Sequence, residues 1–167
     1  GNLKDITQRA LEELNKAHFI FCEDTKNFRK IAGLLNINLE HKTLDSFHDH
    51  SQDQKIRRVI QLLNQKNDVV FVSDAGSPII SDPGQLLVKS CIDNKINVFP
   101  IPGASSVTAS IVVSGFEDKF IFYGFLPKKE KELDKELNKI KDLDFSIVFF
   151  IPGVKINFYL KKFKNFF

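Results

Sequence analysis

The apolar run VVFV (residues 69–72) is followed directly by SDAGSPIISDPG (residues 73–84), which places two aspartates, two glycines and two prolines in one short stretch. A short apolar run bounded by turn-forming residues is typical of a strand that is buried on both faces. Gly76 would let a ligand approach the backbone of the following loop closely. The stretch therefore predicts a buried strand with a binding loop at its carboxyl end.

Similar runs around this stretch predict a parallel sheet. We expect strands at 19–22, 43–47, 68–73 and 96–101, and helices at 5–17, 25–34, 53–65, 84–94 and 105–114. Strands that alternate with helices favour a parallel sheet covered on both faces, and such sheets bind ligands beyond the carboxyl ends of their strands. The predicted fold class is α/β, with a mostly parallel sheet in an N-terminal domain over residues 1–116.

A second α/β domain is predicted over residues 117–167. Its expected elements are a strand at 119–126, a charged helix at 128–143, a strand at 145–151 and a final helical segment from residue 153. The aromatic side chains of that segment need packing partners, and we expect them to lack some: Phe158, Tyr159, Phe163, Phe166 and Phe167. The C-terminal domain is therefore predicted to be incomplete.

Composition and charge narrow the class of protein. The 167 residues are 43% hydrophobic, contain no apolar run long enough for a membrane span and do not begin like a signal peptide. Cys22 and Cys91 lie far apart in apolar surroundings, which predicts buried free thiols and a cytoplasmic protein. Residues 1–118 hold 13 basic and 15 acidic side chains, net −2, whereas residues 119–167 hold 11 and 6, net +5. This basic end is either a solvated helix face or a phosphate-binding surface.

The motifs leave two loops as candidate ligand sites. The sequence has no P-loop, no GxGxxG fingerprint and no nucleophile elbow. The second loop is PIPGASS (residues 100–106), where hydroxyls and free amides at a helix start could hold an anion. Taken alone, each loop favours a structural role, with Ser105 as a helix cap and Asp74 as a turn residue. Together the two loops suggest a small ligand that carries both charges and an adenosine.

Six segments carry a family resemblance, and they occur in the order GNLKDITQRAL, CEDTK, FHDH, VSDAGSPIISDPG, PIPGASS and GFLPKK. From residue 1 to about residue 130, the sequence resembles the ribosomal RNA small subunit methyltransferase I family of the tetrapyrrole methylase superfamily. The resemblance implies an S-adenosylmethionine-dependent enzyme that methylates a cytidine ribose 2′-oxygen of 16S ribosomal RNA in the small ribosomal subunit. It also implies two α/β domains of the tetrapyrrole-methylase type with the cofactor between them, and a homodimer. Neither DNA nor a membrane is expected as a partner.

The resemblance also indicates site residues. The expected cofactor contacts are Asp74, Ala75, Gly76, Ser77, Ser105, Ser106 and Tyr123. The expected RNA contacts are Lys26 and Arg29, together with Lys128 and Lys129, which are expected from the basic charge of residues 119–167. The segment FFIPGVKI (residues 149–156) departs from the family, which has acidic, imidazole and guanidinium groups there. This departure keeps a non-catalytic ribosome-binding module open as an alternative, beside a relative that methylates a tetrapyrrole or a protein side chain.

Methyl transfer to a hydroxyl requires a group that accepts its proton. The candidates are Glu23 and Asp24, which follow the strand at 19–22, and His50 in the segment SFHDHSQ. Asp24 is also well placed to cap the next helix, and His50 could be an ordinary surface-loop residue. His48 and His50 have no third ligand at a convincing spacing, so no metal site is predicted.

Overall fold

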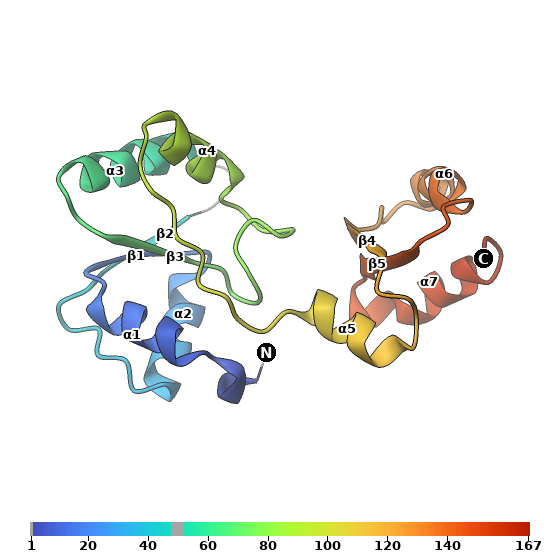
Figure 1. Cartoon of the computed structure of the whole chain (residues 1–167), viewed down its shortest axis with the longest axis horizontal. Coiled ribbons are helices and arrows are strands. Elements are labelled where there is room, and N and C mark those ends of the chain that lie inside the picture. Colours follow the sequence, from blue (N-terminus) through green and yellow to red (C-terminus); the bar gives the residue numbers. More distant parts are fainter. Residues whose placement is uncertain (1, 48–51) are drawn as a thin grey trace. The chain divides into compact units, whose positions relative to one another are not determined.

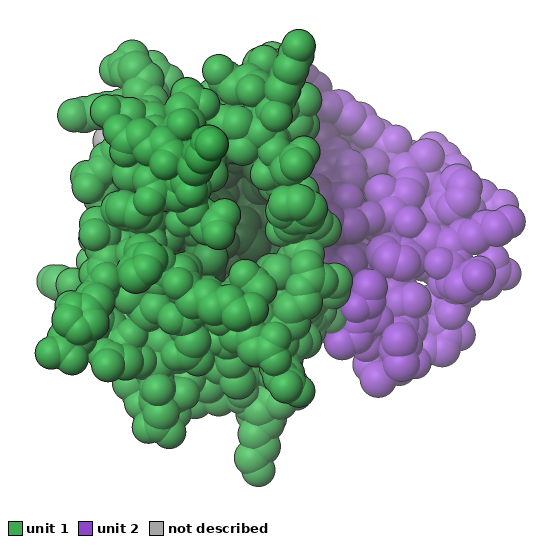
Figure 2. Space-filling view, turned by 60° about the vertical axis from the view of Figure 1, so that its left-hand side comes forward, with its two compact units in different colours: residues 1–105 green, residues 106–167 purple. Residues whose placement is uncertain are grey.

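A computed structural model describes residues 2–47 and 52–167 of the chain. Two compact units, residues 1–105 and 106–167, are coloured separately in Figure 2. The sequence predicts that the first domain ends at residue 116. In the structure, helix α5 (Ser106–Ser114) contacts strand β5 and groups with the second unit.

The first unit is built on a three-stranded parallel sheet. Its strands are β1 (Phe19–Cys22), β2 (Thr43–Ser46) and β3 (Val69–Val72), in the spatial order β2-β1-β3. The register places Cys22, the last residue of β1, beside Ser46 and Val72, the last residues of the other two strands. All three carboxyl ends therefore meet at one edge, and the predicted α/β class with parallel pairing is confirmed.

Helices cover both faces of this sheet. In Figure 1, α1 (Gln8–Lys16) and α2 (Thr25–Leu34) lie on one face, and α3 (Gln52–Asn64) and α4 (Gln85–Asp93) lie on the other. A short 3-10 helix, η1 (Leu3–Asp5), precedes α1. Because side chains alternate along a strand, Ile20 and Cys22 pack with α1 and α2, whereas Phe21 packs with α3 and α4. Strand β1 is thus buried from both sides.

The predicted strand at 96–101 is wrong. Residues 96–104 form no strand, and Val98, Phe99 and Ile101 are 47%, 75% and 36% exposed. An apolar run becomes a strand only when a neighbouring strand completes its hydrogen bonds. Among the described residues of this unit, strand ladders join only β1 to β2 and β1 to β3, so this run has no such neighbour.

The second unit contains two parallel strands, β4 (Phe120–Phe125) and β5 (Ser146–Phe150). Between and after them come α6 (Glu130–Ile140), the short 3-10 helix η3 (Gly153–Lys155) and α7 (Ile156–Phe163). The fully buried members of its core are Leu133 and Leu137 of α6 and Tyr159 of α7. The β4–β5 register shifts between Phe122 and Gly124, where the buried glycine adopts a φ of 80°.

The prediction that the C-terminal aromatics lack partners is wrong for three of them. Tyr159 is fully buried, and Phe163 and Phe166 pack against the same core. Phe158 and Phe167 stay partly exposed, and the incompleteness of the domain remains a prediction. Within the described part of the chain, no helix combines the length and the apolar character that a membrane span needs.

Candidate functional site

The carboxyl ends of β1 and β3 bring two predicted site residues together. Glu23 follows β1 directly, and Asp74 lies two residues beyond the end of β3. The backbone amide of Asp74 donates a hydrogen bond to Oε2 of Glu23 at 3.4 Å. Both residues are half-buried, so Glu23 fastens the start of the 73–84 loop to the end of the neighbouring strand.

Asp24 has a structural function at this edge. Its Oδ1 accepts hydrogen bonds from the backbone amides of Lys26 at 2.7 Å and of Asn27 at 3.3 Å. These are among the amides that a helix leaves without internal partners at its start, so Asp24 is the N-cap of α2. Glu23 and Asp24 are therefore adjacent in sequence but have different hydrogen-bond partners.

A negative field surrounds the end of β1. Burial, together with the nearby carboxylates of Asp74, Asp24 and Asp45, raises the pKa of the Cys22 thiol to about 11, and Arg29 acts in the opposite direction. Three acidic groups from three different segments thus lie near this edge. Such a field favours a ligand that brings positive charge or hydroxyl donors.

The loop 73–84 has an unusual backbone. Positive φ angles occur at Gly76 (74°), Ile79 (77°), Ser81 (65°) and Gly84 (124°). A positive φ is a genuine outlier for a β-branched residue such as Ile79. Strained residues of this kind concentrate at ligand-binding and active sites, because the surrounding structure must hold them in place. The loop is therefore held in a shape that simple turn preferences do not produce.

Gly76 leaves room for a ligand. A Cβ built at Gly76 would meet no heavy atom within 4 Å, and the flanking Ala75 and Ser77 are exposed. The hydroxyl of Ser73 donates to the carbonyl oxygens of Ala75 and Gly76, at 3.4 Å each, which holds the turn. Open space beside this turn, two residues after Asp74 in the sequence, is compatible with a small polar ligand.

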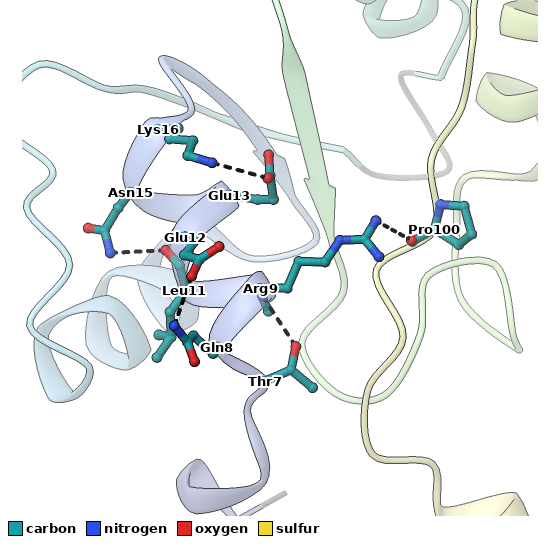
Figure 3. A network of polar contacts seen from close by, with 10 residues as sticks. Thr7, Gln8, Arg9, Leu11, Glu12, Glu13, Asn15, Lys16 and Pro100 are labelled. Atoms are coloured by element: carbon teal, nitrogen blue, oxygen red, sulfur yellow. Dashed lines mark hydrogen bonds and ion pairs between the residues drawn. The ribbon is translucent and has the colours of Figure 1, made fainter.

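The segment before Ser105 is held by side chains of helix α1 that sequence reasoning missed. Figure 3 shows Arg9 directed at Pro100, whose carbonyl oxygen accepts from Nη2 at 3.1 Å. The hydroxyl of Thr7 donates to the carbonyl oxygen of Pro102 at 3.4 Å and accepts from the amide of Ala10 at 3.2 Å. Thr7 lies inside the helix predicted at 5–17, but threonine is a favoured N-cap residue and the structure begins α1 directly after it, whereas nothing in the sequence pointed to Arg9.

A second missed group lies on β2. The Asp45 carboxylate forms ion pairs with Lys55 and Arg58 of α3, the second at 2.7 Å. The two cations lie three residues apart and so share one helix face. This contact joins the start of α3 to the end of β2, which is the same edge at which Glu23 lies.

The other predicted residues are distributed over both units. Ser105 is the last residue of the first unit, and Ser106 begins α5 in the second. Tyr123 of β4 donates its hydroxyl to Oε2 of Glu136 at 2.6 Å, and this bond, with burial, raises the pKa of Tyr123. His50 lies outside the described residues.

The predicted RNA contacts are all exposed. Lys26 and Arg29 lie three residues apart on α2, and so on one side of it. Lys128 and Lys129 precede α6, and Lys129 forms an ion pair with Glu132 at 3.2 Å. Among the described residues, no group of three or more His, Cys, Asp or Glu side chains is placed to hold a metal ion.

Comparisons with known proteins agree with this architecture. Residues 1–163 match the family described as Tetrapyrrole (Corrin/Porphyrin) Methylases. The chain is 39% identical to a Haemophilus influenzae protein over 155 residues, 90% of this chain and 52% of that one. It is 43% identical to a Thermotoga maritima protein over 151 residues, 90% and 66% of the two chains. A Mycoplasmopsis pulmonis protein is 36% identical over 167 residues, 100% and 73%.

All three relatives carry the name Ribosomal RNA small subunit methyltransferase I. The chain spans 52% of the length of the Haemophilus protein and 66% of that of the Thermotoga protein. The family model matches nearly the whole chain, and the parallel α/β units of the structure agree with that match. The chain belongs to the tetrapyrrole methylase family and, within it, to the ribosomal RNA small subunit methyltransferase I family.

Proposed function

We propose that this protein is an S-adenosylmethionine-dependent methyltransferase that methylates a cytidine ribose 2′-hydroxyl of 16S ribosomal RNA in the small ribosomal subunit. The observation that carries the proposal is the junction at which the Glu23 carboxylate accepts from the Asp74 amide. It lies at the carboxyl edge of a parallel sheet, where α/β proteins bind their ligands. The names of the relatives support RNA as the substrate.

The first unit offers suitable groups for the cofactor. S-adenosylmethionine supplies a methyl group on a positively charged sulfur and carries an amino group, a carboxylate and a ribose. We assign contacts to Asp74, Ala75, Gly76 and Ser77, because the backbone at Gly76 is open and the same turn carries the Asp74 carboxylate, which can accept hydrogen bonds. Ser105, Ser106 and Tyr123 complete the assignment from the family resemblance.

For the proton of the ribose hydroxyl we favour Glu23 over Asp24. Glu23 has one carboxylate oxygen, Oε2, on the Asp74 amide and retains Oε1. Asp24 also keeps one oxygen, Oδ2, but its two hydrogen bonds go to the start of its own helix α2, whereas that of Glu23 goes to the proposed cofactor loop. His50 remains a third candidate on the resemblance alone.

The RNA contacts that we propose are Lys26, Arg29, Lys128 and Lys129. They are exposed cations, as phosphate contacts require. Lys129 already pairs with Glu132, so Lys128 should contribute more than Lys129. A cytoplasmic location and a homodimer belong to the same proposal.

Calorimetric titration with S-adenosylmethionine tests the cofactor assignment. In the Gly76→Asn variant, a side chain would enter the open space, while asparagine tolerates the positive φ of 74°. We expect the affinity to fall at least about tenfold with an unchanged melting temperature. The matched control is Gly153→Asn in the second unit, which also points into open space. Equal affinity in the parent and the Gly76 variant would refute the assignment.

Methylation of purified 30S subunits tests the activity itself. A ribose 2′-O-methyl group removes the hydroxyl that attacks the neighbouring phosphodiester, so a product methylated there resists alkaline cleavage at one position. A protein that binds 30S subunits but not S-adenosylmethionine would instead be a ribosome-binding module. Methylation of a base or of a protein would contradict the proposed chemistry.

A further inference from the structure

The second unit has a cavity of about 430 Å³ outside the residues assigned so far, except for Lys128. It is lined by residues from two segments that are far apart in the sequence: Lys128, Glu130, Val154, Lys155 and Phe158. The first two come from the start of α6 and the segment before it, and the others from η3 and α7. The cavity therefore exists because these two segments are held together.

Three contacts, made by Tyr159 and Lys162 of α7, fix the walls of this cavity. The buried hydroxyl of Tyr159 donates to the carbonyl oxygen of Pro127 at 3.3 Å, directly beside Lys128. Lys162 of α7 pairs with Glu130 at 2.6 Å and with Asp134 at 2.9 Å, and these bonds raise its pKa. Because Lys162 neutralises Glu130, the one acidic group in the lining does not cancel the charge of the two lining lysines.

Those lysines are free to bind an anion. Neither Lys128 nor Lys155 takes part in an ion pair among the described residues, and both are exposed. Phe158 is 36% exposed, and its ring packs edge-on against Tyr159 with centroids 5.3 Å apart. The cavity thus combines two unpaired cations with a supported aromatic ring.

We propose that this cavity binds one nucleotide of single-stranded RNA, with the phosphates on Lys128 and Lys155 and the base stacked on Phe158. The proposal rests on the proposed function and assigns a second RNA subsite to it. Cations that follow a phosphate backbone, together with an aromatic ring that stacks a base, are the usual means of binding single strands. A paired base cannot reach the ring, because it is already stacked within its helix.

Fluorescence anisotropy with a short labelled oligoribonucleotide tests the subsite in the full chain. Replacing both lysines, Lys128→Gln with Lys155→Gln, should weaken binding and reduce the slope of log affinity against log salt by roughly 1.4, since each single-strand phosphate contact contributes about 0.7. Phe158→Leu should weaken binding about five- to a hundredfold without changing that slope. Phe158→Tyr should restore binding, because it keeps the aromatic face.

Matched controls separate the subsite from general charge. Lys119→Gln with Lys141→Gln removes two exposed lysines of the same unit that do not line the cavity, and it should change the slope less. Equal effects of the two lysine pairs, or parental binding by Phe158→Leu, would overturn the subsite and leave the methyltransferase proposal intact. Equal affinity of the parent for the oligoribonucleotide annealed to its complement would also overturn it. If the parent protein does not bind S-adenosylmethionine, that result would instead count against the proposed function.

Discussion

Glu23 and Asp24 are adjacent carboxylates, and the structure distinguishes them by their partners. Asp24 accepts two backbone amides of the helix that it precedes, whereas Glu23 accepts one amide from a loop 51 residues away in sequence. A cap stabilises its own helix. A carboxylate that joins a strand end to a ligand loop can also act on what the loop binds.

Substitutions that keep the shape and remove the charge separate these two roles. In Glu23→Gln the amide oxygen can still accept from the Asp74 amide, but it cannot take up a proton at neutral pH. We expect single-turnover methylation of 30S subunits to fall about 10²–10⁴-fold, with cofactor affinity retained. Asp24→Asn should stay within a few-fold of the parent, because its oxygen still caps α2.

Asp24→Ala removes the cap and should lower the free energy of unfolding by about 1 kcal/mol. Melting temperatures measured beside the rates show which losses come from unfolding. If Glu23→Gln methylates at the parental rate, Glu23 only positions the loop, and the base must be sought at Asp24 or His50.

At the scale of elements, the loop 73–84 and helix α2 each contain a glycine, and the two differ in whether the structure leaves room for a side chain. Gly84 has a φ of 124°, and a Cβ added there would lie 2.6 Å from Cε1 of Phe71. The ring of Phe71 packs against Phe47 with centroids 5.1 Å apart, so it has little room to yield. Gly33 lies in α2, and a Cβ added there would meet nothing within 4 Å.

Alanine at these two positions should therefore act in opposite directions. We expect Gly84→Ala to lower the free energy of unfolding by about 1–3 kcal/mol, through overpacking and backbone strain. Gly33→Ala should raise it by about 0.5–1 kcal/mol, because alanine is the better helix former. Urea denaturation followed by circular dichroism measures both. A shift of the same sign in the two variants would contradict this account of the loop.

The elements that could be predicted are those whose signal is local. Strands β1 and β3 follow from short apolar runs, and the meeting of Glu23 with the 73–84 loop follows from parallel strand ends sharing an edge. The segment 96–101 is also largely apolar but forms no strand, because strand formation depends on a neighbour that its own residues do not specify.

The remaining parts of the site depend on contacts between distant segments. The positive φ of Ile79 violates the preference of that residue type, so no propensity could predict it. Lys128 and Lys155 share a cavity only because Tyr159 and Lys162 attach α7 to the start of α6. The hold of Arg9 on Pro100 likewise joins residues 91 positions apart.

For the molecule as a whole, charge is distributed unevenly along the chain. Residues 119–167 carry a net charge of +5, and the remainder carries −2. The first part nevertheless presents Lys26 and Arg29 on one exposed side of α2. Net charge therefore understates the number of cations that could meet RNA phosphates.

Replacing one pair of cations in each unit with glutamine measures how much each unit contributes to RNA binding. Lys26→Gln with Arg29→Gln should reduce the salt slope of RNA binding by up to roughly 1.4, as for the Lys128 and Lys155 pair. The two effects should add in the fourfold variant, because the pairs share no partner. Lys89→Gln with Arg57→Gln is the matched control, since both residues are exposed cations of the first unit. A slope that the α2 pair leaves unchanged would assign Lys26 and Arg29 to the solvated surface.

The two buried thiols have a practical consequence. Labelling reagents attack the thiolate, and a cysteine introduced at an exposed position would hold roughly 100-fold more thiolate at neutral pH than Cys22, whose pKa is raised from 9.0 to about 11. Burial also raises the pKa of Cys91. The two natural cysteines should therefore react only slowly with thiol-specific dyes. One new cysteine in each unit, at the exposed positions of Lys89 and Lys141, would let energy transfer follow the distance between the units as cofactor and RNA are added.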